Sequence, residues 1–401
     1  MSTLPPSTNL RRVGLLVQDV RTTLVSFKLT LVLLGFSMVL VFAATLDQVN
    51  LGIWAVQEKY FRTLVVYGQF GPVALPLFPG GYTVGGLLML NLAAAFVSRF
   101  TLTWRHAGLL LAHAGLILLL VGELLTGLWQ EDYHLRLDQG ETRNYAESFR
   151  AHELVLIDAS EAKFDQVVAI PLSWLERESA VQHPSLPFRL VPKGYHPNAV
   201  LHRRAADAGP AAATAGVGQR IQVTPRPVTY RPKEQNVPAA FVELLGPGQS
   251  LGTYLVSPLL EAPQEFTHEG RTWRIALRPR RLYQPFSLTL LQFSHDRYAG
   301  TEIPKNFSSR LRLNTPDGQG DREVLIFMNN PLRHGGLTFY QSGFANNDRT
   351  TILQVVRNPS WLLPYLACGL MSAGLLAQFG YRLAGFVGRR RRLAAAPPLS
   401  A

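Results

Sequence analysis

The chain has 401 residues, of which 47% are hydrophobic and only 16% are charged, with a mean hydropathy of +0.09. Soluble domains usually carry about a quarter charged residues, so part of this chain is expected outside water. A mean hydropathy so close to zero also predicts a sizeable water-exposed part. The single cysteine excludes a disulfide within the chain, a cysteine-based metal cluster, a dithiol redox site and a c-type haem attachment pair.

Four apolar runs predict membrane-spanning helices. The first covers residues 29–46 and contains no charge, and the others cover 82–98, 107–129 and 361–381. Each run is near the roughly 20 residues that a helix needs to cross about 30 Å of hydrocarbon. A cleavable N-terminal signal is not expected, because the first run lies well inside the chain and no small-residue cleavage site follows it.

The basic residues predict the orientation of these spans. Segments 1–28, 99–106 and 382–401 together carry 11 basic residues and one acidic residue, which is +10 of the net charge of +12. Short loops rich in Lys and Arg stay in the cytoplasm, so both termini are expected inside and segment 130–360 outside. The cluster Arg389–Arg392 directly follows a span, which favours contact with anionic lipid over nucleic acid.

Two segments are expected outside the membrane. Segment 47–81 is rich in aromatic residues and is predicted to be an amphipathic loop on the outer surface. Segment 130–360 predicts a mainly antiparallel sandwich or open barrel, as one domain or as two lobes divided near residues 203–219, a flexible insertion poor in bulky side chains. Its expected strands are rich in β-branched or aromatic residues and lie at 152–157, 188–191, 272–277, 286–293, 309–313, 324–328, 337–341 and 351–356.

His113 is the most informative polar residue within a predicted span. Ionisable groups are costly in hydrocarbon and point to function, and a neutral imidazole can bind a metal. A hydrogen bond between helices explains His113 equally well. His106 lies seven residues earlier, on nearly the same face but about 10 Å along the axis, so the two histidines cannot ligate one haem iron from opposite sides. His106 is next to Arg105 and is expected at the cytoplasmic interface.

The other polar residues of the spans have simple structural explanations. Glu123 is expected to be an interfacial carboxylate or to pair with a cation of a partner protein. Asn91 is expected to form a hydrogen bond between helices, and Cys368 is expected to pack among small residues. The remaining eight histidines are scattered over segment 130–360 without ligand spacing, so no self-sufficient enzyme is predicted.

Four strings of the sequence form a distinctive set. They are Leu24-Val-Ser-Phe-Lys-Leu-Thr-Leu and Ala44-Thr-Leu-Asp-Gln near the first span, Gly300-Thr-Glu-Ile-Pro-Lys-Asn-Phe-Ser-Ser, and a longer outer string from Met328 to Phe344. Together they resemble the ResB family, also called CcsB, of the system II cytochrome c maturation machinery. The last string, Met-Asn-Asn-Pro-Leu-Arg-His-Gly-Gly-Leu-Thr-Phe-Tyr-Gln-Ser-Gly-Phe, is the most specific. The order of three spans, a large outer domain and a fourth span is also similar.

This resemblance implies a bacterial inner-membrane subunit of a cytochrome c haem lyase that does not act alone. It would export or hold haem b and present apocytochrome c, together with a Trp-rich membrane protein of the CcsA/ResC type. The resemblance places one haem ligand at His113, with the second ligand supplied by the partner. His106 is a weaker alternative ligand, and no catalytic residue is expected.

Two rival functions remain at this stage. One is a non-catalytic membrane scaffold whose outer β domain binds an envelope protein, with His113 only a contact between helices. The other is a transporter or mechanotransmitter subunit, for which four spans with so few polar residues offer no evident substrate path.

Overall fold

The computed structural model describes residues 18–71, 73–99, 103, 105–161, 163–205, 209–229, 236–260, 262–300 and 304–394. Arg11, Arg12, Trp104, residues 301–303 of the string that starts at Gly300, and the end of the basic tail after residue 394 lie outside these residues. The chain divides into two compact units. One holds the helices within residues 1–130 and 358–401, and the other comprises Glu131–Thr229 and Lys233–Arg357.

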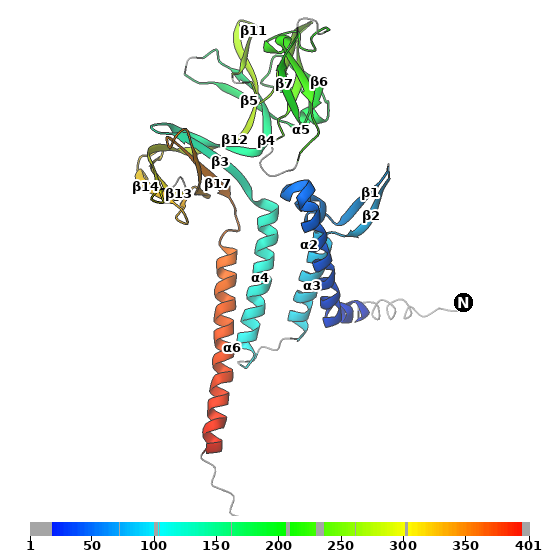
Figure 1. The fold of residues 1–401 in the computed structure, drawn as a ribbon, viewed down its shortest axis with the longest axis vertical. Helices are drawn as coiled ribbons and strands as arrows, with labels where there is room; N and C mark the ends of the chain where they lie inside the picture. The colour runs from blue at the N-terminus through cyan, green and yellow to red at the C-terminus, as the bar shows by residue number, and fades with distance from the viewer. Residues whose placement is uncertain are drawn as a thin grey trace, which may run out of the picture. The chain divides into compact units, whose positions relative to one another are not determined.

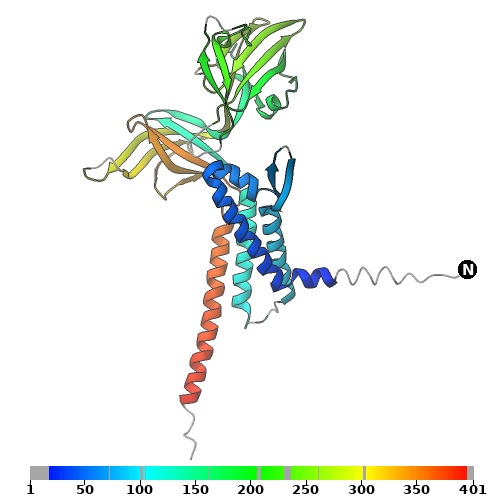
Figure 2. The same cartoon turned by 45° about the vertical axis from the view of Figure 1, so that its right-hand side comes forward.

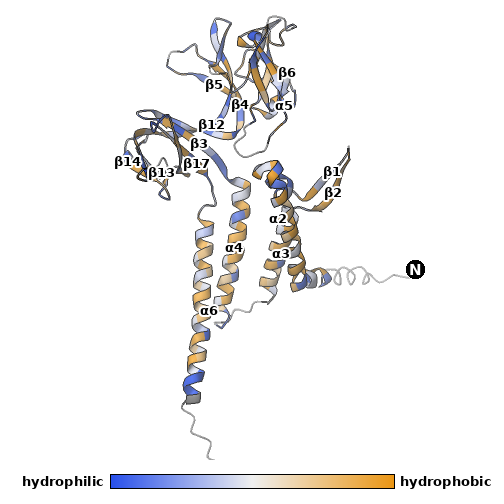
Figure 3. Cartoon of the chain, in the orientation of Figure 1, coloured by the Kyte–Doolittle hydropathy of each residue, from blue (hydrophilic) through white to orange (hydrophobic). Residues whose placement is uncertain are grey.

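The helical unit contains four helices that are long and apolar enough to cross a membrane, which confirms the four predicted runs. They are α2 (Phe27–Val56), α3 (Gly81–Arg99), α4 (Ala107–Trp129) and α6 (Leu363–Ala394). Figure 1 shows α4 beside α6 and α2 beside α3, and Figure 3 shows that apolar residues dominate these helices until the last turns of α6. α6 continues through Arg389–Arg392, so much of the expected basic tail is helical.

The segment expected as a surface loop, 47–81, is more regular than the sequence suggested. Helix α2 continues through it to Val56 and bends at Gly52, whose φ is 77°. A π-helical turn (Gln57–Phe61) and a hairpin of β1 (Val65–Phe70) and β2 (Val73–Pro79) follow. The bend brings Lys59 and Tyr60 back to the carboxylate of Asp47, at 2.6 and 2.7 Å, which compensates the polar residue within the helix. The placement of segment 47–81 on a membrane surface stays a prediction.

The second unit is an antiparallel β structure, as expected. Ten strands form one sheet, whose main path runs in the order β14-β13-β12-β4-β3-β17-β16-β15, and all its described pairings are antiparallel. β5 and β11 pair with β4 and β12 off this path. The strands of the path are β3 (Glu131–Asp138), β4 (Thr142–Asp158), β12 (Arg271–Arg297), β13 (Pro304–Asn314), β14 (Arg322–Phe327), β15 (Leu332–His334), β16 (Leu337–Ala345) and β17 (Thr350–Arg357).

Smaller elements complete this unit. A three-stranded sheet has the order β10-β9-β6, and β7 pairs with β8. These elements, with the two off-path strands, are β5 (Gln166–Pro171), α5 (Ser173–Glu176), β6 (Arg189–His196), β7 (Ala199–Arg203), the 3-10 turn η2 (Val217–Arg220), β8 (Ile221–Pro225), β9 (Ala239–Gly246), β10 (Gln249–Val256) and β11 (Gln264–His268).

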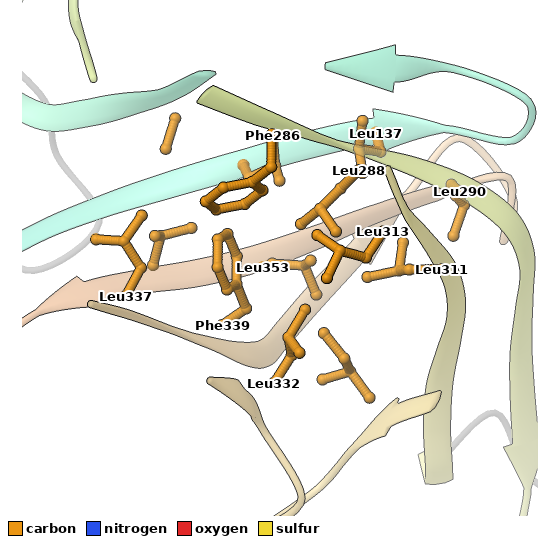
Figure 4. Close-up of a cluster of buried hydrophobic side chains, with 14 of the residues drawn as sticks. Leu137, Phe286, Leu288, Leu290, Leu311, Leu313, Leu332, Leu337, Phe339 and Leu353 are labelled. Atoms are coloured by element: carbon orange, nitrogen blue, oxygen red, sulfur yellow. The ribbon is translucent and has the colours of Figure 1, made fainter. Parts of the chain in front are cut away.

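Two large hydrophobic cores lie along the same two long strands. The first half of β12 supplies Ile275 and Leu277 to one core, and the second half supplies Leu288 and Leu290 to the other. The buried positions of β12 are odd-numbered from Trp273 to Leu277 and even-numbered from Phe286 to Leu290. Between these two stretches the pairing with β4 shifts register after Pro279 and again after Tyr283. Figures 1 and 2 show β4 and β12 extending between the two groups of strands. Figure 4 shows the core that contains Leu288 and Leu290, to which β16 adds Phe339 and β17 adds Leu353.

This arrangement corrects the expected division near residues 203–219. The lobes divide within β4 and β12, and the supposed flexible insertion is anchored by two buried residues, Ala213 and Gly218. Ala213 is 2% exposed, and a Cβ on Gly218 would lie 2.6 Å from the Cβ of Leu255. The small side chains of this stretch allow close packing against β10, which composition alone could not distinguish from flexibility.

Candidate functional site

Three glycines set the contact between α4 and α6. Gly108, Gly115 and Gly122 are spaced seven residues apart and all are buried. A Cβ on Gly108 would lie 2.7 Å from the carbonyl oxygen of Gly374, and one on Gly115 would lie 2.8 Å from that of Ala367. The two backbones therefore approach closely along this face of α4, which leaves no room for side chains there.

His113 lies on a different face of α4. It is two residues before Gly115, which corresponds to a rotation of about 200° around the helix. Its ring is partly buried, and Nδ1 lies 2.9 Å from the carbonyl oxygen of Leu109. Because a carbonyl only accepts hydrogen bonds, Nδ1–H donates, and Nε2 carries the lone pair of the neutral ring. Nε2 is the nitrogen that could ligate iron.

An apolar groove lies between α3 and α4. Its volume is about 370 Å³, within the range of small-molecule sites. The groove is lined from α3 and α4 by Ala93, Phe96, Val97, Ala114, Ile117, Leu118 and Val121. His113 is not among these residues, although Ala114 follows it in the chain and Ile117 lies one turn further along α4.

His106 occupies the cap position before the first residue of α4. Its ring is exposed, and Nδ1 lies 2.9 Å from Oγ1 of Thr103. The contact with Thr103 does not bring His106 near His113, because the two histidines are seven residues apart along the chain. The expected position of His106 at the cytoplasmic interface stays a prediction.

The other polar residues of the helices have defined positions. Asn91 is 2% exposed, accepts a hydrogen bond from Thr30 at 2.6 Å and donates to the carbonyl of Leu24 at 2.5 Å, which confirms the predicted bond between helices. Glu123 is exposed. Cys368 is also exposed, so it makes no buried packing contact within this chain, and its expected packing among small residues stays a prediction. The residue before it, Ala367, is buried and lies on the side of α6 that faces α4.

The Met328–Phe344 string has a structural explanation in the β unit, which comprises Glu131–Thr229 and Lys233–Arg357. Oε1 of Gln341 accepts a hydrogen bond from the buried Ser309 hydroxyl at 2.6 Å, and its Nε2 lies 3.0 Å from Oγ1 of the buried Thr351. A bulge between Gln341 and Gly343 leaves Ser342 exposed. The turn before β16 has φ of +59° at Gly335, where a Cβ would lie 2.7 Å from the Phe286 ring. The string therefore specifies a turn, a bulge and a buried polar network.

A second cluster in the same region escaped the sequence analysis. Nδ1 of His295 lies 2.9 Å from a carboxylate oxygen of Asp348, and the other oxygen accepts from Arg297 at 3.2 Å. His295 and Asp348 are 53 residues apart, so no local spacing could indicate the pair. His295 lies within β12 and Asp348 in the turn before β17, and no sequence pattern links the two.

Comparison with known proteins identifies this region. Residues 268–352, which run from the end of β11 into β17 and include the Gln341 network and the His295 cluster, match the model of the ResB-like family. The chain carries a ResB-like segment. The resemblance expected from the sequence is thereby confirmed, and its most specific string lies wholly within the ResB-like segment.

Two individual proteins are also similar. Protein NrfI of Wolinella succinogenes is 35% identical over 102 residues, which make up 25% of this chain and 11% of NrfI. The chain therefore corresponds to a small part of that relative. Among solved structures, Cytochrome c Heme Lyase CcmF is 12% identical over 74% of this chain and 30% of that chain, with a TM-score of 0.22.

Proposed function

We propose that this chain is a membrane subunit of a cytochrome c maturation complex. Its support is the ResB-like segment together with four helices that could cross a membrane. In this proposal the chain resides in the bacterial inner membrane with both termini in the cytoplasm and the β unit outside, as the distribution of basic residues predicts. Its partners are a membrane protein of the CcsA/ResC type and apocytochrome c.

We propose further that His113 is an axial ligand of haem b, the cargo shared with the partner. The observation that carries this proposal is the position of His113 within a helix that could cross a membrane, with Nδ1 bound to the carbonyl of Leu109. That hydrogen bond orients the ring and leaves the lone pair on Nε2, as is typical of iron-ligating histidines. Since α4 offers one histidine at this level, the second axial ligand comes from the partner.

The β unit has the task of holding an extended segment of apocytochrome c. Strand β14 lies at the end of the large sheet and pairs with β13, and its last residue, Phe327, also forms a bridge with Asn330. Leu325 and Phe327 are exposed on it, at 46% and 37%. An open edge with alternating apolar side chains suits the addition of a peptide strand. Cross-links from a bound apocytochrome peptide should map to residues 130–360, and their consistent absence there contradicts this role.

The test of haem ligation uses the chain co-expressed with its CcsA/ResC-type partner. Reduced visible spectra are recorded for the unmodified chain, His113→Ala, and His106→Ala as the control on the same helix. A bis-imidazole haem band that weakens in His113→Ala, returns with added imidazole and persists in His106→Ala is the expected result. Equal haem in all three removes His113 from the site, and no haem in any of them favours the scaffold function.

A further inference from the structure

The hairpin of β1 and β2 carries exposed apolar side chains on both of its faces. Residues 63–98, which include the hairpin and nearly all of α3, contain no charged residue. Tyr67 pairs with Pro76, the neighbour of Leu75, so Tyr67 and Leu75 belong to opposite faces. The large exposed side chains are Tyr67, Val73, Leu75 and Leu77, at 54%, 53%, 46% and 56%. An isolated two-stranded hairpin is only marginally stable in water, and apolar surface of this kind indicates a contact outside the chain.

A ring contact with α2 gives the depth of the hairpin base along that helix. Phe78, near the end of β2, packs against Phe36 of α2 with 5.3 Å between ring centroids. Phe36 lies eight residues after Lys28 and eleven residues before Asp47, which corresponds to about 12 Å and about 16 Å of helix. The residues between Lys28 and Asp47 are uncharged, and their length is close to the roughly 30 Å of a hydrocarbon core. Phe78 therefore lies beside the middle of a predicted span.

The contact between α2 and α3 gives a consistent depth. Thr30 of α2 donates to Asn91 of α3 at 2.6 Å, and α3 begins ten residues before Asn91, about 15 Å along its axis. Asp47 lies 17 residues after Thr30, or about 25 Å along α2. The two helices are side by side and run in opposite directions (Figure 1). The start of α3, to which the hairpin is attached, therefore lies about 10 Å short of the level of Asp47.

The deepest part of the hairpin is covered by protein, as a non-helical backbone in hydrocarbon requires. Val66, which pairs with Phe78, is 3% exposed, and the amide of Gly80 donates to the carbonyl of Leu64 at 2.8 Å. Two residues of β2, Pro76 and Pro79, have no N–H to leave unpaired at a sheet edge. The strands are about 20 Å long at about 3.3 Å per residue, which is enough to reach from the middle of a bilayer to its surface. Figures 1 and 2 show the hairpin extending from the start of α3 toward the end of α2 that carries the bend.

We propose that the β1–β2 hairpin is embedded in one leaflet of the bilayer, with its base near the membrane centre and lipid acyl chains against Val73, Leu75 and Leu77. A loop that lies on a membrane surface needs one apolar and one polar face, whereas this hairpin is apolar on both. Its polar side chains fit the same placement, because Tyr67 and Gln69 lie toward the turn, where the interface would be. The hairpin thereby anchors α2 and α3 at a fixed depth in that leaflet.

The test uses full-length single-cysteine variants in a Cys368→Ala background, labelled with the fluorophore NBD and reconstituted into nanodiscs of phosphatidylcholine and phosphatidylglycerol. Leu75→Cys reports on the hairpin. Leu34→Cys, on α2 at a residue that is 47% exposed, is the control for a lipid-facing helix, and Ser342→Cys on the exposed bulge of β16 is the control for water. Quenching is measured with nitroxide-labelled lipid acyl chains and with aqueous iodide. The Leu75 and Leu34 probes should be quenched by the nitroxide lipid and emit at shorter wavelength than the Ser342 probe, which iodide alone should quench.

Three results overturn the inference. Iodide quenching of the Leu75 probe equal to that of the Ser342 probe places the hairpin in water. Shielding of the Leu75 probe from both quenchers shows that protein covers it instead of lipid, and iodide quenching of the Leu34 probe contradicts the insertion of α2 itself. If Leu75→Cys does not reconstitute, Val73→Cys on the same face decides by the same criteria. The measurement needs neither haem nor a partner, so its result is separate from that of the test of the proposed function.

Discussion

Replacing Gly115 by alanine tests whether the α4–α6 contact has the closeness seen in the structure. The new Cβ would lie 2.6 Å from Cγ of Met371, 2.8 Å from the carbonyl oxygen of Ala367 and 2.9 Å from the Met371 nitrogen. Two of these atoms belong to the backbone, so α6 itself must move. Overpacking of this kind costs about 1–3 kcal/mol, against a gain of about 1 kcal/mol in helix propensity.

Gly127 provides the matched control on the same helix, because nothing lies within 4 Å of a Cβ built there. Gly127→Ala should therefore gain up to about 1 kcal/mol. The free energy of unfolding of the two variants should differ by about 1–3 kcal/mol, with Gly115→Ala the less stable.

The assay is reversible unfolding of the purified full-length chain in mixed detergent micelles, followed by helical circular dichroism. In the complex with the partner, Gly115→Ala should also weaken the haem band assigned to His113, because a shifted α6 displaces α4. Equal stability of the two variants would show that α4 and α6 do not pack through the glycine face, and would refute the reasoning.

Three further predictions concern the β unit. Gln341→Ala should lower the free energy of unfolding by about 1–3 kcal/mol, because it removes the amide that bonds to the buried hydroxyls of Ser309 and Thr351 and leaves them only each other. Glu153→Gln should cost about 3–5 kcal/mol by chemical denaturation, because Arg278, 15% exposed and 2.9 Å away, keeps a buried charge. Burial lowers the pKa of His134 and of His152, so only the unfolded chain takes up these protons just below about pH 6.5. Stability should therefore fall as the pH drops from 7 toward 5, and His152→Gln should reduce that slope in unfolding measured across this range.

The Gln341 and Glu153 predictions each have a control in the same unit. Ser342→Ala, on the exposed bulge beside Gln341, should change stability by less than about 0.5 kcal/mol. Arg312→Ala breaks an ion pair with Glu323 in which both side chains are about half exposed, and should cost less than about 1 kcal/mol. If the buried and exposed changes have equal effects, or if the pH slope of His152→Gln is unchanged, the respective burial argument is wrong.

Much of the fold is readable from local sequence. Apolar runs of span length predicted four helices, because hydrocarbon thickness sets a length that composition reveals directly. All eight expected strand segments overlap observed strands. The most specific of the four strings that resemble the ResB family contains a glycine turn and a bulge, and these features constrain nearby residues strongly enough to leave a recognisable pattern.

The organisation of the β unit could not be predicted as well from the sequence. Residues 272–277 and 286–293 looked like separate strands, whereas they belong to the single strand β12. A register shift after Pro279 changes which positions face inward, so the period of two breaks although the strand continues. Residues 209–219 looked flexible because small residues occur both in mobile linkers and where chains pack closely.

The sequence by itself determined the four apolar helices, the antiparallel β character, the charge asymmetry and the candidacy of His113, because each depends on residues within one short segment. Only the tertiary structure decided which face of α4 packs against α6, where the two cores divide, and that Asp348 meets His295. Those outcomes depend on register and helix rotation between segments that are tens to hundreds of residues apart, where a shift of one residue moves a side chain to another face.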